Sequence, residues 1–484
     1  MVKRSKSRVE KRVERQGLGE GTETATRITG ATPYEFGARG LTPYGGLLPV
    51  VQLLERLEFR QLLAERLTVK RQPAAMSVYD FVLAIVIALY IGFDRLSHLA
   101  FLATDVVITG IVGVVKLPVQ STFWRFLNSL GLHNVRQWEQ IHRELQSRVW
   151  QAAQIRRNMI TIDTDTTVNT VYGHQVGARK SYNPKNRGKR SYQPILSFIA
   201  ETGEFIFGNQ RNGDKPSGQE VAKHLEGVFT ALPPGVTRVR TRQDAGFYSW
   251  EAVNVNEAHG AEYIIVAQKT TALQRKLEEV AWRPDRHLRA EVADFLYEPQ
   301  GWDGPRRFVA VRTPLEQGAQ PGTAEQYQLF ASTQYMYRVF VTNWKTSPAS
   351  VVEGYAGRAA AENLIKEANN DAGLAAVPGR SFITNKNFFF LAMLAYNLNR
   401  WLMLFNHVGK EPYRRTMLST ARLKYVFIAA KVIRHARRGR IRYSREYEEQ
   451  SRFNALMDRL GSICSAGGKF ISAFRFPAEV LAAP

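Results

Sequence analysis

The sequence predicts an α/β fold, in which an all-helical N-terminal domain precedes a mixed β-sheet with flanking helices that is interrupted by a β-rich insertion. Apolar residues recur at helical spacing up to about Trp150, and from Asn158 they alternate with a period of two. The chain has 484 residues, 44% of them hydrophobic, which is enough for two or three globular domains. These observations together exclude a disordered or purely helical protein.

The composition indicates a polyanionic partner. The chain carries 66 Lys and Arg against 43 Asp and Glu, a formal charge of +23. This surplus favours nucleic acid, because each phosphate that is neutralised releases condensed counterions. A ribosome-like protein or one lying on a membrane surface is the alternative.

Two further features bear on where the chain acts. Cys464 is the single cysteine, which excludes an intrachain disulfide and a cysteine-based zinc site and favours a reducing cytoplasm. The longest uncharged apolar run, residues 81–93, has 13 residues, fewer than the roughly 20 that span a bilayer. We therefore expect no membrane contact, and we expect this run to form a buried helix.

Changes in periodicity, charge, Pro and Gly divide the chain into six expected regions. These are a basic flexible arm over 1–45, a helical DNA-binding or dimerisation domain over 46–155, the first part of the core over 156–268, a β-rich insertion over 269–345, the second part of the core over 346–410, and a basic C-terminal helical region over 411–484. In the helical domain, Trp124, Arg125 and Asn128 would share one exposed side of a helix and face DNA. Alternatively, Trp124 and Phe126 pack inward.

The core is expected to hold a mixed sheet. Alternation predicts a strand in 158–173, two strands joined at 201–203, a strand that ends at Asp244 and a strand in 262–268. Helices are expected over 218–232 and after Ser249. Strand-like segments 307–315, 327–333 and 337–344 mark the insertion, a helix starts at Ser347-Pro348, and an apolar helix over 387–405 must be buried.

Aspartates on two predicted strands are candidate ligands. Asp163 and Asp165 lie two residues apart, so both project from one face of the sheet. A carboxylate on such an apolar strand is costly to bury unless it is paired or binds metal, although an exposed face with ordinary charges gives the same pattern. Asp244 stands where a strand opens into a loop, a usual place for ligands in α/β sheets, and a turn or capping aspartate is the alternative.

A third carboxylate lies far along the chain. Tyr355, Arg358 and Glu362 follow at i, i+3 and i+7, which places them on one helical face. Arg358 could grip a phosphate and Tyr355 could position the backbone or stack on a base, whereas an ordinary ion pair of Arg358 with Glu362 is the alternative. Carboxylates suit Mg²⁺ or Mn²⁺, and a pair of such ions about 3.5–4 Å apart can serve phosphodiester cleavage.

A resemblance to a known family rests on three stretches, 162–196, 240–249 and 355–371, and on the FVTN segment 340–343. Over roughly residues 40–445 the chain resembles bacterial insertion-sequence transposases of the DDE class, in the cut-and-paste group whose catalytic helix carries a Tyr-x2-Arg-x3-Glu-x6-Lys signature. The resemblance implies an RNase H-like core with a β-strand insertion before the last catalytic helix. It also implies a bacterial, cytoplasmic and nucleoid-associated protein.

The resemblance assigns roles to the acidic residues. The family's first aspartate precedes a small residue and a threonine, which matches Asp165 better than Asp163, so Asp163 is the alternative first carboxylate. Asp165, Asp244 and Glu362 are then the catalytic residues and hold two Mg²⁺ ions, for which Mn²⁺ can substitute. The signature lysine is replaced by Asn369, and Lys366, at i+4 from Glu362, is a candidate substitute for its phosphate contact.

A basic stretch with two tyrosines follows the first catalytic strand. We expect it to hold the DNA backbone near the scissile phosphate, whereas a solvated charge run is the alternative. The DNA-binding residues expected here are Lys180, Lys185, Arg187, Lys189 and Arg190.

The sequence therefore predicts a transposase that binds terminal inverted repeats and catalyses metal-dependent strand cleavage and strand transfer. Its partners would be the double-stranded DNA of the transposon ends and of the target, held by a homodimer on DNA. A metal-dependent nuclease of the same fold is one alternative. A catalytically decayed DNA-binding copy is the other, motivated by Asn369.

Overall fold

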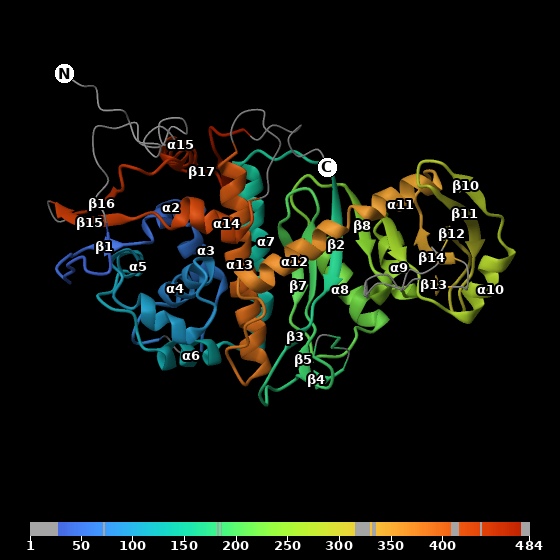
Figure 1. Cartoon of the computed structure of the whole chain (residues 1–484), viewed down its shortest axis with the longest axis horizontal. Coiled ribbons are helices and arrows are strands. Elements are labelled where there is room, and N and C mark those ends of the chain that lie inside the picture. Colours follow the sequence, from blue (N-terminus) through green and yellow to red (C-terminus); the bar gives the residue numbers. More distant parts are fainter. Residues whose placement is uncertain are drawn as a thin grey trace, which may run out of the picture. The chain divides into compact units, whose positions relative to one another are not determined.

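The computed structural model describes residues 28–475, except 71–72, 182, 185, 315–329, 332–334, 408–415 and 436–437 (Figure 1). The chain divides into two compact units, Met1–Arg39 and Gly40–Pro484. Most of the expected basic arm lies outside the described residues. The second unit holds the elements of the predicted α/β class.

The described elements between Gly45 and Ala152 are all helical. The apolar run 81–93 forms most of α4, whose residues from Phe81 to Tyr90 are at most 2% exposed, so the predicted buried helix is confirmed. Ser77 begins this helix by accepting a hydrogen bond from the backbone N–H of Asp80. The helical bounds are η1 Gly45–Leu47, α2 Leu48–Arg56, α3 Phe59–Arg66, α4 Val78–Tyr90, η2 Leu96–Leu102, α5 Val106–Val112, α6 Gln120–Ser129 and α7 Leu132–Ala152.

Helix α6 combines both expectations for its aromatic residues. Phe126 is buried, as inward packing requires, and it stacks on Phe81 with ring centroids 4.7 Å apart. Trp124 is 45% exposed, and Arg125 and Asn128 are exposed as well. The outward side of α6 thus presents the three residues that the sequence placed there.

These helices share one core with a helix from the far end of the chain. Helices α7 and α13 (Phe382–Phe405) lie side by side (Figure 1), and residues of α4, α7 and α13 belong to the same buried cluster. In the described part of the chain, α13 is the one helix that is long and apolar enough to cross a membrane, and its apolar stretch is wholly buried in the protein. The predicted burial of residues 387–405 is confirmed.

A large mixed sheet forms the other half of the unit. Among the described residues its strand order is β10-β11-β12-β14-β9-β8-β2-β6-β7, with β13 beside β14. Strands β2, β8 and β9 are parallel, and the other pairs are antiparallel. The strands are β2 Met159–Thr166, β6 Ile195–Ile199, β7 Phe205–Asn209, β8 Arg238–Gln243, β9 Glu262–Val266, β10 Arg283–Asp285, β11 Ala290–Tyr297, β12 Arg306–Pro314, β13 Phe330–Ala331 and β14 Tyr335–Thr342.

The helices between these strands match the predicted order. Helix α8 is capped by Ser217, and α9 by Ser249, whose hydroxyl accepts from the N–H of Ala252. The bounds are α8 Gly218–Thr230, η3 Ala245–Phe247, α9 Trp250–Ala258, α10 Thr271–Glu279, α11 Pro348–Ala356 and α12 Ala359–Asp371.

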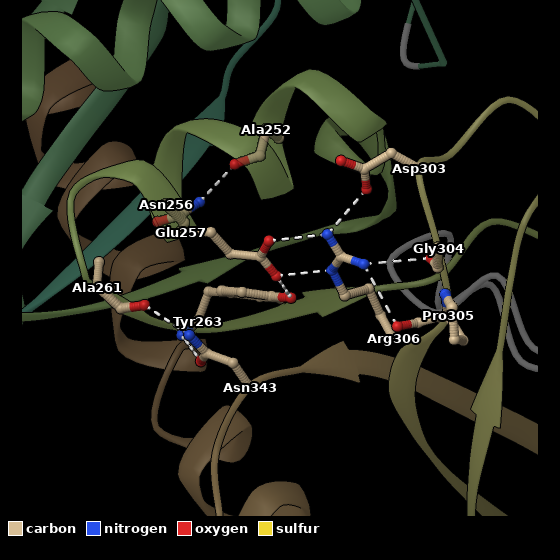
Figure 2. Close-up of polar contacts among 10 residues, drawn as sticks. All are labelled: Ala252, Asn256, Glu257, Ala261, Tyr263, Asp303, Gly304, Pro305, Arg306 and Asn343. Carbon is tan, nitrogen blue, oxygen red and sulfur yellow. Dashed lines mark hydrogen bonds and ion pairs between the residues drawn. The ribbon is translucent and has the colours of Figure 1, made fainter.

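The strands of the expected insertion continue this sheet. Strand β14 pairs with β9, and β12 pairs with β14. A partly buried polar network supports the junction (Figure 2): Glu257 on α9 accepts from Arg306 on β12 at 2.8 and 3.0 Å and from the hydroxyl of Tyr263 on β9 at 2.9 Å. The interruption of the core by an insertion stays a prediction, but its strands do not stand apart as a sheet of their own.

The C-terminal region departs from the all-helical prediction. Its described part holds α14 Leu418–Ala421, η4 Arg422–Val426 and α15 Gln450–Gly461, but also the strands β15 Ala430–His435, β16 Arg438–Tyr443, β17 Cys464–Ala466 and β18 Lys469–Ile471. Strand β15 pairs with both β16 and β1 (Leu41–Thr42). Basic residues occupy every second position from Arg438 to Arg442, which is strand periodicity, and the prediction of a helical region did not take this into account. The small sheet β3 Asn169–Thr170, β4 Arg179–Lys180 and β5 Arg190–Tyr192 completes the elements.

Candidate active site

Strand β2 carries two aspartates on one face with different partners. Asp163 is 1% exposed, and its two oxygens accept from Nε and Nη2 of Arg242 at 2.6 and 2.8 Å. The parallel pairing of β2 with β8 places Arg242 directly beside Asp163. Nη1 of Arg242 donates to the carbonyl of Gly354 at 2.8 Å. Asp163 is therefore fully engaged in a bidentate pair that joins β2, β8 and α11.

That pair also shapes the segment where the predicted catalytic helix was expected. The expectation of one continuous helix through Tyr355, Arg358 and Glu362 is wrong, because α11 ends at Ala356 and α12 begins at Ala359. At the junction the N–H groups of Arg358 and Ala361 donate to carbonyls three residues back. A Cβ on Gly357 would meet Nη1 of Arg242 at 2.3 Å, so glycine is required for this close approach and weakens the helix there.

Asp165 and Asp244 converge on one guanidinium. Nη2 of Arg358 lies 2.8 Å from Asp165 Oδ2 and 3.9 Å from Asp244 Oδ2. The backbone N–H of Thr166 donates to Asp165 at 2.7 Å, and that of Gly246 donates to Asp244 at 2.9 Å. The two aspartates thus approach the same guanidinium from the carboxyl ends of β2 and β8.

The pair of Asp165 and Arg358 is less complete than that of Asp163. Both residues are buried, with 9% and 5% of their surface exposed. Yet Nε and Nη2 of Arg358 have no aligned hydrogen-bond acceptor among the described residues, so the contact with Asp165 is an electrostatic one. The guanidinium is held by charge rather than by directed bonds.

Burial dominates the electrostatics of Asp165. It raises the pKa of this carboxyl to about 7, against the opposing charge of Arg358 and with a further upward contribution from Asp244 and Glu362. Burial alone would lower the pKa of Arg358, but the charges of Asp165, Tyr355 and Asp244 outweigh it and raise that pKa. The site holds negative charge in a desolvated place, which is costly without a cation.

The remaining predicted residues of the signature lie around this centre. Glu362 stands in the first turn of α12, partly exposed and close enough to act on the charge of Asp165. Lys366 is exposed one turn further on. Tyr355 is 7% exposed and packs on Phe340 with centroids 5.0 Å apart, so its ring is placed by the core rather than presented to a base.

Comparison with protein families decides what this arrangement belongs to. The sequence profile described as "Transposase DDE domain group 1" matches residues 33–464. The chain belongs to this transposase family. The resemblance in the sequence to DDE transposases is thereby confirmed, and the mixed α/β fold carries a DNA transposase domain over most of its length.

No curated protein sequence matches the chain. Among solved structures, the transposase is similar to a cryo-EM structure of the piggyBac transposase synaptic complex with hairpin DNA, with 12% identity and a TM-score of 0.43 over 80% of this chain and 82% of that one.

Domains of this family generally use divalent metal ions, and the donor set of the transposase fits them in kind. Two carboxylates face a position that already attracts a cation, and carboxylate oxygen is the ligand that Mg²⁺ and Mn²⁺ prefer. Among the described residues, however, no three or more Asp, Glu, His or Cys side chains are arranged as a ready metal-binding group. Arg358 lies between the aspartates where the sequence led us to expect the ions.

Asn369, at the position where the resemblance predicted a signature lysine, has a definite contact. Its Nδ2 donates to the hydroxyl of Thr167 at 2.9 Å, and so ties α12 to the segment directly after Asp165. A lysine at this position would present a charge instead. The position therefore links α12 to the segment that follows β2 in this chain.

The basic stretch after β2 is largely exposed, but one of its two tyrosines is buried. Tyr192 is fully buried, and its hydroxyl donates to the carbonyl of Val176 at 2.6 Å. Tyr182 and Lys185 lie outside the described residues. The exposed cations, which form no ion pair with the described residues, are Lys180, Arg187, Lys189 and Arg190.

Sequence reasoning missed Arg242 and Gly357. The signal for Arg242 was available, because an arginine two residues before Asp244 shares its strand face. What it pairs with depends on the β2–β8 register, which the sequence of one strand does not contain.

Proposed function

We propose that the chain is a cut-and-paste DNA transposase, which binds the terminal inverted repeats of a mobile element, cleaves the strand at each end and joins the freed 3′-hydroxyl to target DNA. The observation that carries this proposal is the convergence of Asp165 and Asp244 on Arg358, with Glu362 one turn further along α12. These residues come from the ends of two strands and the start of a helix, and the chain belongs to a family of transposases.

In the proposed mechanism Asp165, Asp244 and Glu362 hold two Mg²⁺ ions, with Mn²⁺ as a substitute. Bound divalent cations supply activation of the attacking oxygen and stabilisation of the leaving oxygen in phosphodiester chemistry. Arg358, held without aligned hydrogen bonds, turns from Asp165 toward a DNA phosphate. The burial of Asp165 keeps bulk water away and strengthens each electrostatic contact.

The surrounding cations hold the DNA in this proposal. Lys366 and the exposed residues of the basic stretch contact the backbone near the scissile phosphate, and Lys185 is proposed to join them. Two ends must be cut together, so the active species is a homodimer on DNA. A cytoplasmic protein on the bacterial nucleoid suits both this substrate and the single cysteine.

The test is an oligonucleotide assay with Mg²⁺, using duplexes copied from the DNA on both sides of the reading frame. The parent should nick the end and join it to a target plasmid, whereas Asp244→Asn should bind the duplex and do neither. Asparagine keeps the side-chain oxygen that accepts from Gly246, so the turn stays intact.

Other outcomes would replace the proposal. Cleavage without joining would support a metal-dependent nuclease of the same fold. Retained DNA binding with equal inactivity of parent and variant would indicate a decayed copy, and Asn369 is the observation that favours testing for it.

A further inference from the structure

A second basic site lies away from the carboxylates. A cavity of about 750 Å³ opens between α7, α8, the end of β7 and the start of α13. Five cations and two carboxylates line it: Arg136, Arg143, Arg211, Lys223, Lys386, Glu139 and Glu220.

The cavity is on the opposite face of the sheet from the aspartates. Ile195, which lines it, shares a face with Ser197, and Ser197 bonds to His224 on α8 at 2.8 Å. Asp165 is directly paired with Leu196, which faces the other way. The metal-binding residues proposed above therefore take no part in this cavity.

The cations of the cavity are not neutralised by its carboxylates. Glu220 is taken by Arg211, at 2.6 Å. Glu139 is then left to balance the rest. Arg136 and Lys223 are exposed and form no ion pair with any described residue.

Lys386 lies among several of these charged side chains. This half-buried ammonium contacts Asn209 at 3.2 Å. Burial lowers its pKa, and the like charges of Lys223 and Arg211 lower it further, against the opposing charge of Glu139. Positive side chains that repel one another in a partly enclosed space are stabilised when an anion enters.

The cavity is continuous with the basic stretch. Its rim segment 211–214 packs against that stretch, since the N–H of Gln193 donates to the carbonyl of Asn212 at 3.2 Å. Arg179 also forms an ion pair with Asp214 on the rim. The segment 211–214, which begins at the cavity, therefore contacts residues at both ends of the basic stretch.

We propose that this cavity binds backbone phosphates of a DNA segment other than the one held at Asp165, Asp244 and Glu362. The inference rests on the proposed function in taking DNA as the polyanion. An open site joined to an exposed basic stretch fits a continuous backbone better than a free phosphate or pyrophosphate, which would need enclosure.

The test compares two triple variants with equal charge change. Arg136→Gln, Arg143→Gln and Lys223→Gln remove exposed cations of the cavity, and Lys116→Gln, Arg275→Gln and Lys424→Gln remove exposed cations elsewhere. Binding of a labelled duplex is measured by anisotropy against KCl. Each lost phosphate contact reduces the slope of log K against log salt by about 0.9, so the cavity variant should have a slope shallower by about 2 to 3 and the control should match the parent.

A second readout locates the DNA. Lys223→Cys in a Cys464→Ser background should displace the leaving thiol of a duplex whose phosphate tether carries an activated mixed disulfide, and so form a protein–DNA disulfide, whereas Lys116→Cys should not. Equal slopes for the two triple variants, or no difference between the two cross-linking positions, would overturn the proposal while leaving cleavage by the parent intact. Cross-linking at Lys223 that millimolar pyrophosphate abolishes, with an unchanged slope, would assign a small-anion site instead. Failure of the parent to bind or cleave DNA would count against the proposed function itself.

Discussion

Two buried ion pairs, only two residues apart on β2, differ in how completely they are satisfied. Asp163 and Arg242 form a bidentate pair at 2.6 and 2.8 Å, and the third nitrogen of Arg242 donates to the carbonyl of Gly354. Asp165 meets Arg358 through one contact at 2.8 Å, and two nitrogens of Arg358 lack an aligned acceptor. The same residue types thus give a closed pair and an open one.

The difference separates structure from chemistry within one strand. A closed pair has no capacity left for a ligand, and removing either partner exposes the full cost of a buried charge. An open pair keeps oxygen lone pairs that can accept a ligand and a guanidinium that can turn toward another anion. Asp163 therefore holds Arg242 in place beside Gly357 and the start of α12, whereas Asp165 keeps the capacity for the ligands that we propose for it.

The largest expected effect tests the closed pair. Asp163→Asn leaves Arg242 buried without its carboxylate and should lower the free energy of unfolding by about 3 kcal/mol or more, measured by urea denaturation. The double variant Asp163→Leu with Arg242→Met should recover most of that loss, because no charge is left buried. A decrease in the free energy of unfolding of less than about 1 kcal/mol in Asp163→Asn would show that the pair does not stabilise this part of the fold.

The second effect tests the open pair through pH. The folded state raises the pKa of Asp165 from 3.8 to about 7, so the folded protein binds a proton there more readily than the unfolded chain does. Ionised Asp165 costs stability in full above pH 7, and that cost falls as pH drops toward 3.8. Without metal, the parent should therefore gain about 2 kcal/mol relative to Asp165→Asn between pH 7 and pH 5.

Thermal or urea unfolding of both proteins at the two pH values measures this difference. A stability difference that is the same at pH 5 and pH 7, or that changes in the opposite direction, would mean that the folded state does not raise the pKa of Asp165.

The smallest effect concerns the link between the two catalytic elements. Asn369→Ala removes the hydrogen bond to Thr167, which is worth about 1 kcal/mol, and should slow cleavage about fivefold without changing DNA affinity. Asn370→Ala, at an exposed position on the same helix, is the matched control. Equal rates for the two variants would remove Asn369 from the account, and weaker DNA binding in Asn369→Ala would indicate a direct DNA contact instead.

Much of the sheet could be predicted because its strands alternate visibly. Strands β2, β6, β7, β8 and β9 and helices α8 and α9 lie where periodicity and caps placed them. Strand β11 was missed because its sequence AEVADFLY mixes charged and apolar residues on both faces. The helical break before α12 was missed because it depends on Arg242 approaching Gly357 from another strand.

The types of residue in the site could also be predicted, but their pairing could not. The sequence places Asp163 and Asp165 on one face of a strand and Asp244 at the end of another, and it shows arginines nearby. Which arginine meets which aspartate follows from the register of β2 against β8 and from the position of α11, and both are properties of the folded chain. For the same reason the sequence did not predict the cavity beside α8, because its cations come from four separate segments of the chain.

The most direct test of the central claim is a Mn²⁺ titration followed by electron paramagnetic resonance, with an end-sequence duplex bound and at pH 8. The parent should bind Mn²⁺, and each of Asp165→Asn, Asp244→Asn and Glu362→Gln should weaken the binding at least about tenfold. The folded fraction of Asp163→Asn should bind as the parent does. Loss of Mn²⁺ binding in Asp163→Asn with retention in Asp165→Asn would contradict the account.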